Sequence, residues 1–459
     1  MLKGLEISEV RLSELERTWR IDSEFYRKEN LHIQYILKMT NASPLTDFVA
    51  VSDGNHMSIS DNFCEKGIPY YRGQDIHDFF IENAVPVCIP DAVYKMPTMI
   101  RSHLKKGDVL LSIVGTIGEV SLVNTNNSAT CSCKLAILRP KANLKSEIIA
   151  IFLQSKYGQN QIRKFIRGAV QMGFILEDIN QIFIPIFSPG FQSQIEQIVK
   201  TAHEKLSDSK SLYAEAEEIL LSELGLKGWQ PSNTAVNVKK LKESFLQTGR
   251  LDSEYYLPKY DDIESLIRKY RLGCDVISNK FSLNLDVCDY AEKEYNYIEI
   301  SDINVGDGSA SFNTIPTNEL PDNAKRVIHV GDVLVSKVRP YRGAVSVITS
   351  SPENLIASGA FTVLHEKSDY KKEVLQVILR SQIYKDWLLK WNVGSSYPVI
   401  KDEDILNLQI PLLPKTLQTE IAENVQKSIN LRKEAKMLLE SAKTQVENTI
   451  QAGGGIEPL

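Results

Sequence analysis

Basic side chains gather in two stretches of the chain, one in each half. Residues 154–173 carry Lys156, Arg163, Lys164 and Arg167 and no acidic residue. Residues 325–342 carry five basic residues against the single acid Asp332: Lys325, Arg326, Lys337, Arg339 and Arg342. Lysine and arginine neutralise phosphates, and arginine also donates paired hydrogen bonds to base edges. A solvated surface explains one such run equally well, but runs in both halves favour a shared anionic ligand.

The chain lacks the residue patterns of common catalytic sites. It has no phosphate-binding loop of the Gly-x4-Gly-Lys-Ser/Thr type, no Gly-x-Gly-x-x-Gly after a strand, no His-Glu-x-x-His and no Asn-Pro-Pro-Tyr. The glycine-rich segment 305–309 is interpreted as a turn. Four aspartates at corresponding places would suit a nuclease, but turns and strand starts explain them better: Asp75, Asp302, Asp108 and Asp332.

The composition is that of an ordinary soluble globular protein of 459 residues, 43% hydrophobic and 24% charged. A net charge of −5 argues against a polycation that coats nucleic acid, so any basic surface must be local. The six cysteines are scattered, which favours reduced thiols over a metal site. No run of about 18 apolar residues occurs, so we expect no membrane span and a cytoplasmic location.

The chain repeats itself. Four segments of the first half return in the same order at offsets of 224 to 230 residues: 20–26 as 250–256, 70–76 as 297–303, 106–112 as 330–336 and 178–185 as 404–411. A repeat of this length is a duplicated domain, because solenoid repeats span only a few tens of residues. The duplication predicts a pseudo-dimer, which suits a target of two-fold character such as duplex DNA.

Each half follows one order of elements. Short β-branched runs predict strands at 110–114, 136–138 and 333–335. Helical stretches are expected at 148–166 and 373–391, and each is followed by a short strand that ends in Ile-Pro, at 184–185 and 410–411.

A long amphipathic helix is expected at the end of each half. Residues spaced by three and four form a seam along each helix: Ile195, Ile198, Ala202, Lys205, Ser209, Leu212, Ala216 and Ile219 in the first, and Ile421, Val425, Ser428, Arg432, Ala435, Leu439, Ala442, Val446 and Thr449 in the second. We expect the two helices, each about 30 residues long, to pair with each other. The alternative is that each helix packs only on its own domain.

These repeated motifs resemble those of the specificity subunit of Type I restriction-modification enzymes. The resemblance covers nearly the whole chain and rests on the order of the motifs, repeated twice: Arg-x-Asp-Ser-Glu-Tyr/Phe-Tyr, Gly-Asp-Val-Leu-x-Ser, Asp-Ile-x4-Ile-Pro and a glutamine-containing long helix. The chain departs from the family at the start of each long helix. Pro-Gly-Phe-Gln at 189–192 and Pro-Lys-Thr-Leu-Gln at 414–418 stand where the family often has Pro-x-x-Glu-Gln.

The resemblance implies an α+β fold with two pseudo-symmetric α/β target-recognition domains separated by two long antiparallel coiled-coil helices. The domains are expected at 1–189 and 231–413, with a central spacer helix within 190–230 and a C-terminal one within 414–459. It implies a non-catalytic subunit that reads one half of a bipartite double-stranded DNA target with each domain. It also implies docking of two modification (methyltransferase) subunits and, through them, restriction/translocase subunits. S-adenosylmethionine, ATP and Mg would belong to those partners.

Residue types suggest which side chains touch DNA. Arginine suits guanine, glutamine suits adenine, and other cations hold phosphates. The candidates in the first domain are Arg72, Gln74, Arg163, Lys164, Arg167 and Gln171. Those in the second domain are Lys337, Arg339, Tyr341, Arg342, Ser395, Ser396, Tyr397 and Lys401. Two alternatives remain: an enzyme with a diverged site, and a scaffold subunit of a related defence complex that does not read DNA.

Overall fold

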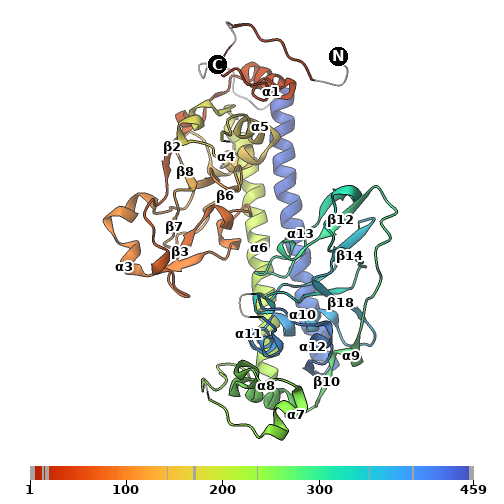
Figure 1. The fold of residues 1–459 in the computed structure, drawn as a ribbon. Coiled ribbons are helices and arrows are strands. Elements are labelled where there is room, and N and C mark those ends of the chain that lie inside the picture. The colour runs from red at the N-terminus through yellow and green to blue at the C-terminus, as the bar shows by residue number, and fades with distance from the viewer. Residues whose placement is uncertain are drawn as a thin grey trace. The chain divides into compact units, whose positions relative to one another are not determined.

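The computed structural model describes residues 6–12, 15, 20–141, 143–168, 172–234, 236–350, 352–394 and 397–453 (Figure 1). The chain forms two compact units, Met1–Lys205 with Lys433–Leu459, and Leu206–Arg432. Each unit mixes helices with small sheets, which confirms the predicted α+β class. Each unit contains part of both long helices. The domain boundaries expected from the sequence instead treat those helices as spacers separate from the domains. Those boundaries stay a prediction.

The first unit contains a four-stranded antiparallel sheet and a three-stranded mixed sheet. The strand order of the first sheet is β2 (Val49–Asp53), β8 (Leu135–Pro140), β5 (Val109–Ser112) and β6 (Val120–Leu122). The second sheet pairs β3 (Ile68–Tyr71) antiparallel with β4 (Val87–Ile89) and parallel with β7 (Thr130–Cys131). All four residues of β5 are buried, which explains why this central strand is a continuous apolar run.

The first unit also contains α-helices. They are α1 (Lys28–Met39), α2 (Leu45–Phe48), α3 (Asp91–Tyr94), α4 (Ser146–Gln154) and α5 (Lys156–Lys164), and a strand pair of β1 (Ser43–Pro44) with β9 (Phe183–Ile184) completes the unit.

A single helix was expected at 148–166, but the structure breaks it at Ser155. Ser155 is extended, and its side chain accepts the backbone N–H of Gly158 at the start of α5. A Cβ on Gly158 would lie 2.3 Å from the carbonyl oxygen of Phe152, so only glycine allows the two helices to meet this closely.

The second unit repeats this plan. Its antiparallel sheet has the order β11 (Phe281–Leu283), β18 (Phe361–Glu366), β15 (Val333–Ser336) and β16 (Val345–Val347). Its mixed sheet has the order β13 (Asn313–Pro316), β12 (Glu294–Ile298), β17 (Leu355–Ser358) and β14 (Ala324–Val327), and β12 and β17 are parallel. The strand pair is β10 (Cys274–Val276) with β19 (Gln409–Pro411). The predicted strands at 136–138 and 333–335 are therefore confirmed as parts of β8 and β15, and the one predicted at 110–114 is β5, which ends at Ser112.

The helices of the second unit are α7 (Phe245–Thr248), α8 (Pro258–Arg268), α9 (Ile277–Lys280), α10 (Lys372–Arg380), α11 (Gln382–Leu388) and α12 (Asp402–Leu406). The helix expected at 373–391 breaks at the extended residue Ser381, in the same way as its counterpart in the first unit.

The two long helices are α6 (Pro189–Glu223) and α13 (Lys415–Ala452), and they lie side by side and antiparallel within each unit (Figure 1). In the first unit, Gln194 donates to Gln445 at 2.8 Å and Lys205 pairs with Glu434 at 2.5 Å. As the residue numbers increase along α6, those of the paired residues on α13 decrease, so the two helices are antiparallel. The predicted mutual pairing is therefore confirmed. Among the described residues, no helix combines the length and apolar character that a membrane crossing needs.

The buried seam agrees with the expected one on α13 at the companion positions Val425 and Val446, and differs from it on α6. Residues seven apart are fully buried as expected: Ile195, Ala202 and Ala216 on α6, and Ile421, Ser428, Ala435 and Ala442 on α13. The companion positions on α6 lie four residues after these, at Val199 and Leu220, where three was expected. Straight α-helices of 3.6 residues per turn allow either spacing.

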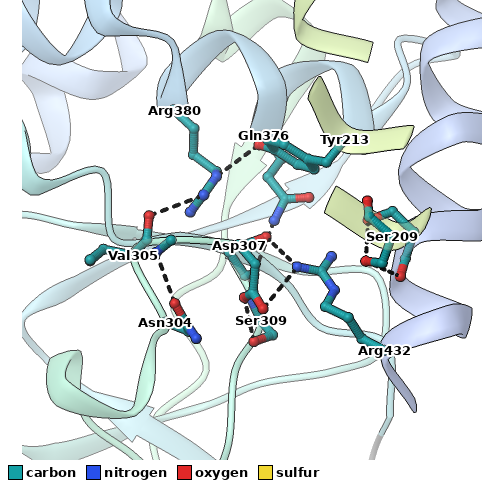
Figure 2. Close-up of polar contacts among 12 residues, drawn as sticks. Ser209, Tyr213, Asn304, Val305, Asp307, Ser309, Gln376, Arg380 and Arg432 are labelled. Carbon is teal, nitrogen blue, oxygen red and sulfur yellow. Dashed lines mark hydrogen bonds and ion pairs between the residues drawn. The ribbon is translucent and has the colours of Figure 1, made fainter. Parts of the chain in front are cut away.

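A loop of the second unit docks on α13 and α10, and Arg380 of α10 links it to α6 (Figure 2). Arg432 of α13 donates to the carbonyl oxygen of Asp307 at 2.8 Å and pairs with its carboxylate at 3.1 Å. Arg380 of α10 donates to the Tyr213 hydroxyl of α6 at 2.7 Å and to the carbonyl of Val305 at 3.1 Å. Segment 305–309 is therefore a turn, as predicted, and it fixes the sheet region to the helices.

Candidate nucleic-acid interface

The repeated opening motif forms a clasp inside each unit. In the first unit, Arg20 donates to Asp22 at 2.7 Å and to the carbonyl of Lys164 at 3.3 Å. Its guanidinium carbon lies 4.8 Å from the centre of the Phe25 ring, and Lys164 Nζ lies 4.1 Å from that centre. The hydrogen bond from Arg20 holds the pKa of Asp22 below its ordinary value of 3.8. The motif ties the start of the repeat to the end of α5.

The second unit builds the same clasp from different residues. Arg250 donates to Asp252 at 2.9 and 2.6 Å and to the carbonyl of Asn392 at 2.9 Å. Its guanidinium carbon lies 4.6 Å from the Tyr255 ring centre, and Lys390 Nζ lies 5.4 Å from it. Lys390 therefore corresponds to Lys164. Both lysines have a structural contact, and a DNA contact by Lys164 stays a prediction.

The paired aspartates are structural supports. Asp108, 1% exposed, accepts the backbone N–H of Lys105 at 2.8 Å and two hydrogen bonds from Arg139 at 2.7 Å. The same bonds raise the pKa of Arg139. A buried carboxylate that accepts three hydrogen bonds from the protein in this way holds a turn.

Asp332 repeats this arrangement in the second unit. It is buried, accepts the N–H of His329 at 2.9 Å and Asn284 Nδ2 at 3.1 Å, and lies 2.9 Å from His365 Nδ1. Asp75 and Asp302 cap short helical turns by accepting the N–H groups of Arg72 and Glu299. In the part of the chain that the structure describes, no three potential metal ligands cluster.

Arg72 and Gln74 follow strand β3. The Arg72 guanidinium donates to both carboxylate oxygens of Asp75 at 3.0 Å and is one-third exposed. Gln74 lies on the next turn, Gly73–Asp75, and is exposed. The structure brings these two candidates together at one surface, with Arg72 held rigidly by its ion pair.

The other candidates of the first unit lie around the end of α5. Arg163 is exposed and donates to the carbonyl of Gln159 at 3.3 Å. Arg167 is 45% exposed and pairs with the buried carboxylate of Asp178 at 2.6 Å. Burial raises the pKa of Asp178 even though Arg167 opposes the shift. Gln171 lies outside the described residues.

Lys337 and Lys401 line one open hollow of about 360 Å³ in the second unit. Lys337 Nζ lies 3.1 Å from the carboxylate of Asp402, which also lines the hollow, and Lys401 is exposed. Asn323 completes the polar lining. Sequence patterns did not indicate Asn323 or Asp402, because neither residue lies in a repeated motif and the hollow exists only after folding.

Arg339 and Tyr397 meet at the surface of the same unit. The guanidinium carbon of Arg339 lies 4.4 Å from the centre of the Tyr397 ring, and that ring is 57% exposed. Tyr341 and Arg342, on the short turn Pro340–Arg342, are also exposed. Ser395 and Ser396 lie outside the described residues. The second unit therefore presents a cationic and aromatic surface formed by two loops distant in sequence.

Comparison with known proteins supplies the remaining observations. A scan against protein-family models finds no match. Among solved structures, an S subunit of a Type I restriction-modification system from M. genitalium covers 91% of this chain and 96% of its own, with 12% identity and a TM-score of 0.41. An HsdS subunit from Thermoanaerobacter tengcongensis covers 90% and 95%, with 15% identity and a TM-score of 0.28.

A curated relative matches at the level of sequence. It is the specificity subunit of the Type I restriction enzyme MjaVIII of Methanocaldococcus jannaschii, 21% identical over 450 residues. The alignment covers 94% of this chain and 97% of the relative. The resemblance to Type I specificity subunits that the repeated motifs carry is thereby confirmed across nearly the whole chain.

Proposed function

We propose that this protein is the DNA sequence-specificity subunit of a Type I restriction-modification complex. Its similarity to such a subunit over nearly the full length of both chains carries the proposal. The repeated plan supports it, because two domains of one design with different surfaces suit a target made of two different halves. Each unit reads one half of a bipartite duplex.

The long helices are the proposed docking surface for two modification subunits. Their seam is buried, while their outer faces carry exposed side chains such as Lys200, Glu204 and Lys436. The partner subunits bind S-adenosylmethionine and, in the restriction subunits, ATP and Mg. The chain itself contributes no catalytic group. A non-catalytic role agrees with the buried aspartates Asp108 and Asp332, whose oxygens accept hydrogen bonds from the protein itself.

The formal charge of −5 bears on affinity. Sequence-independent affinity for DNA comes from cations that displace counterions from phosphates. A chain with this charge holds DNA weakly by itself, and the partner subunits supply much of the phosphate contact. Specificity would then lie in this chain and overall affinity in the complex.

The proposal is tested with the purified chain, alone and co-purified with its cognate modification subunit. Labelled duplexes at salt concentrations of about 50 to about 200 mM give the affinity and its salt dependence. We expect salt-dependent binding by the complex, and methyl transfer from labelled S-adenosylmethionine only when the modification subunit is present. Turnover by the chain alone would instead indicate an enzyme. A stable complex without salt-dependent binding would indicate a scaffold.

A further inference from the structure

The loop that follows β5 in the first unit has a defined backbone pattern. The carbonyl of Ile113 accepts the N–H of Phe174 at 2.9 Å. Arg167 and Gly173 exchange two backbone hydrogen bonds at 2.9 and 2.8 Å. Gly115, at the tip, has a φ of +87°, and a Cβ added there would meet nothing within 4 Å.

The loop that follows β15 in the second unit repeats most of this pattern, except that the N–H of Val399 donates to the side chain of Asn392. The carbonyl of Lys337 accepts the N–H of Ile400 at 3.0 Å, and that of Val399 accepts the N–H of Val393 at 2.9 Å. Val338 bridges to Val399 as Val114 bridges to Gly173. The two loops are therefore equivalent positions on equivalent scaffolds.

At the position of Gly115, the second unit has Arg339, with a φ of +49°. Left-handed backbone suits glycine and is strained for an arginine. Such strain persists only where the surroundings impose it, and it is found most often at functional sites. The other described non-glycine residues with positive φ are Asn41, Tyr290 and Asn354. The asparagines are well suited to this conformation, and Arg339 is not.

Two contacts hold Arg339 in this conformation. Its backbone N–H donates to the carbonyl of Pro398 at 2.8 Å. Its guanidinium stacks against the exposed ring of Tyr397, with 4.4 Å from Cζ to the ring centre. A guanidinium held over an aromatic ring is restrained in its orientation, and a point contact to a phosphate does not require such a restraint. Paired donation to O6 and N7 of guanine in the major groove does require it.

We propose that Arg339 is a specificity-determining residue that reads a guanine in the half-site of the second unit, oriented by Tyr397. This inference rests on the proposed function and additionally names the base that is read, guanine, and the residue that reads it, Arg339. The first unit, with Gly115 at the same place, makes no equivalent contact. The two half-sites therefore differ at the position that this loop reaches.

The test uses the complex of the full chain with its modification subunit. The methylated motif is first mapped for the wild-type chain, and each guanine of the half-sites is then replaced by 7-deazaguanine, which lacks the N7 acceptor. We expect one guanine of one half-site to lose binding by about 5- to 150-fold in the wild type. With Arg339→Gly that guanine should become dispensable, and the mapped motif should turn degenerate at that position only.

Matched variants separate specificity from folding and charge. Glycine fits the backbone of position 339, so Arg339→Gly should keep the thermal unfolding midpoint or raise it. Lys367→Ala removes one exposed positive charge from the same unit and should leave the motif unchanged. Tyr397→Phe keeps the ring and should preserve discrimination, whereas Tyr397→Ala should weaken it.

The outcomes are distinguishable. If the wild-type complex yields no motif, the proposed function fails and the inference fails with it. If a bipartite motif is found but Arg339→Gly leaves every position intact, only the inference is overturned. Uniformly weaker binding to all sequences, with a salt slope lower by about one, would make Arg339 a phosphate contact and would also overturn it.

Discussion

At the scale of single residues, the repeated aspartates support the fold. Asp108 is buried and its oxygens are filled by Arg139 and a turn N–H. Asp108→Asn keeps the size of the side chain but removes the charge that Arg139 pairs with. We expect a loss of about 1–2 kcal/mol in the free energy of unfolding, measured by urea denaturation.

Asp332→Asn is the matched variant of the second unit. Asp332 has neutral or titratable partners, Asn284 and His365, instead of an arginine. Its substitution should therefore cost less than that of Asp108 at pH 8. An equal or larger loss at Asp332 would show that the two carboxylates do not differ through their partners.

A pH effect follows from Glu82. Burial alone would raise its pKa, but hydrogen bonds from His203 and Asn124 outweigh burial and hold the pKa below the ordinary 4.5. A depressed carboxyl pKa stabilises the folded state above pH 4.5, and this contribution is lost as the pH falls through the folded-state pKa. Glu82→Gln should therefore be less stable than wild type at pH 6, with the difference shrinking toward pH 3.

The pKa of Glu147 is shifted in the opposite direction to that of Glu82. Burial raises its pKa above the ordinary 4.5, so ionisation opposes folding as the pH rises through the raised value. Glu147→Gln should thus gain stability relative to wild type on going from pH 4 to pH 7. Unfolding curves at several pH values measure both variants. The same sign of change for Glu82→Gln and Glu147→Gln would contradict the assignments.

At the scale of elements, the glutamine at the start of each long helix is a clamp. Gln192 accepts the N–H of Lys145 at 3.1 Å and donates to the carbonyl of Phe187 at 2.9 Å. Gln418 makes the equivalent bonds to Lys371 and Leu413, at 3.1 and 2.8 Å. The departure from the family pattern at these helix starts thus leaves the buried glutamine and its contacts in place.

Gln192→Glu and Gln418→Glu test the clamp. A carboxylate keeps the acceptor but cannot donate to the buried carbonyl, which would be left unsatisfied. We expect each variant to lose about 1–3 kcal/mol at pH 7, measured by denaturant unfolding. Gln197→Glu, on an exposed face of α6, is the control and should change stability little. Equal small effects at all three positions would exclude the clamp.

The two long helices also share a buried polar contact in the second unit. The hydroxyls of Ser209 and Ser428 lie 2.9 Å apart, and each donates to the other residue's carbonyl at 2.8 Å. Because the hydroxyls share one small site, Ser209→Ala and Ser428→Ala should not be additive. A double-mutant cycle should give a coupling of about 0.5 kcal/mol or more, whereas full additivity would contradict the contact.

The sequence predicted which elements form and missed their local geometry. Heptad spacing placed Ile195, Ala202 and Ala216 correctly, since burial every seven residues is a strong signal. On α6 the companion position lies one residue from the expected one, at Val199 and Leu220, because spacings of three and four both fit a helix. The break at Ser155 depends on Gly158 touching another helix turn, a contact that no pattern of hydrophobic residues encodes.

The candidate site was predictable only in part. Arginine and tyrosine types pointed to Arg339 and Tyr397, but their stacking joins loops 58 residues apart in sequence. Lys164 was chosen for its charge, and the aromatic clasp that receives it became visible only in the folded unit. The sequence thus identifies the cationic side chains, but only the folded structure shows which of them make contacts within the protein.

At the scale of the whole molecule, the duplication is the central feature. The two units share the plan of the antiparallel sheet, the clasps, the buried aspartates and the helix clamps, while the loops at Gly115 and Arg339 differ. Under the proposed function, a duplicated protein with unequal loops would recognise two unequal half-sites. The asymmetry of the target should therefore follow from the loops, and its bipartite form from the repeat.

One measurement tests this account most directly: co-expression of the chain with its modification subunit, followed by single-molecule sequencing of the host DNA. We predict a split, asymmetric motif with a modified adenine on each strand, one in each half. A continuous motif, or an intact complex that leaves no motif at all, would contradict the claim that each unit reads half of one DNA target.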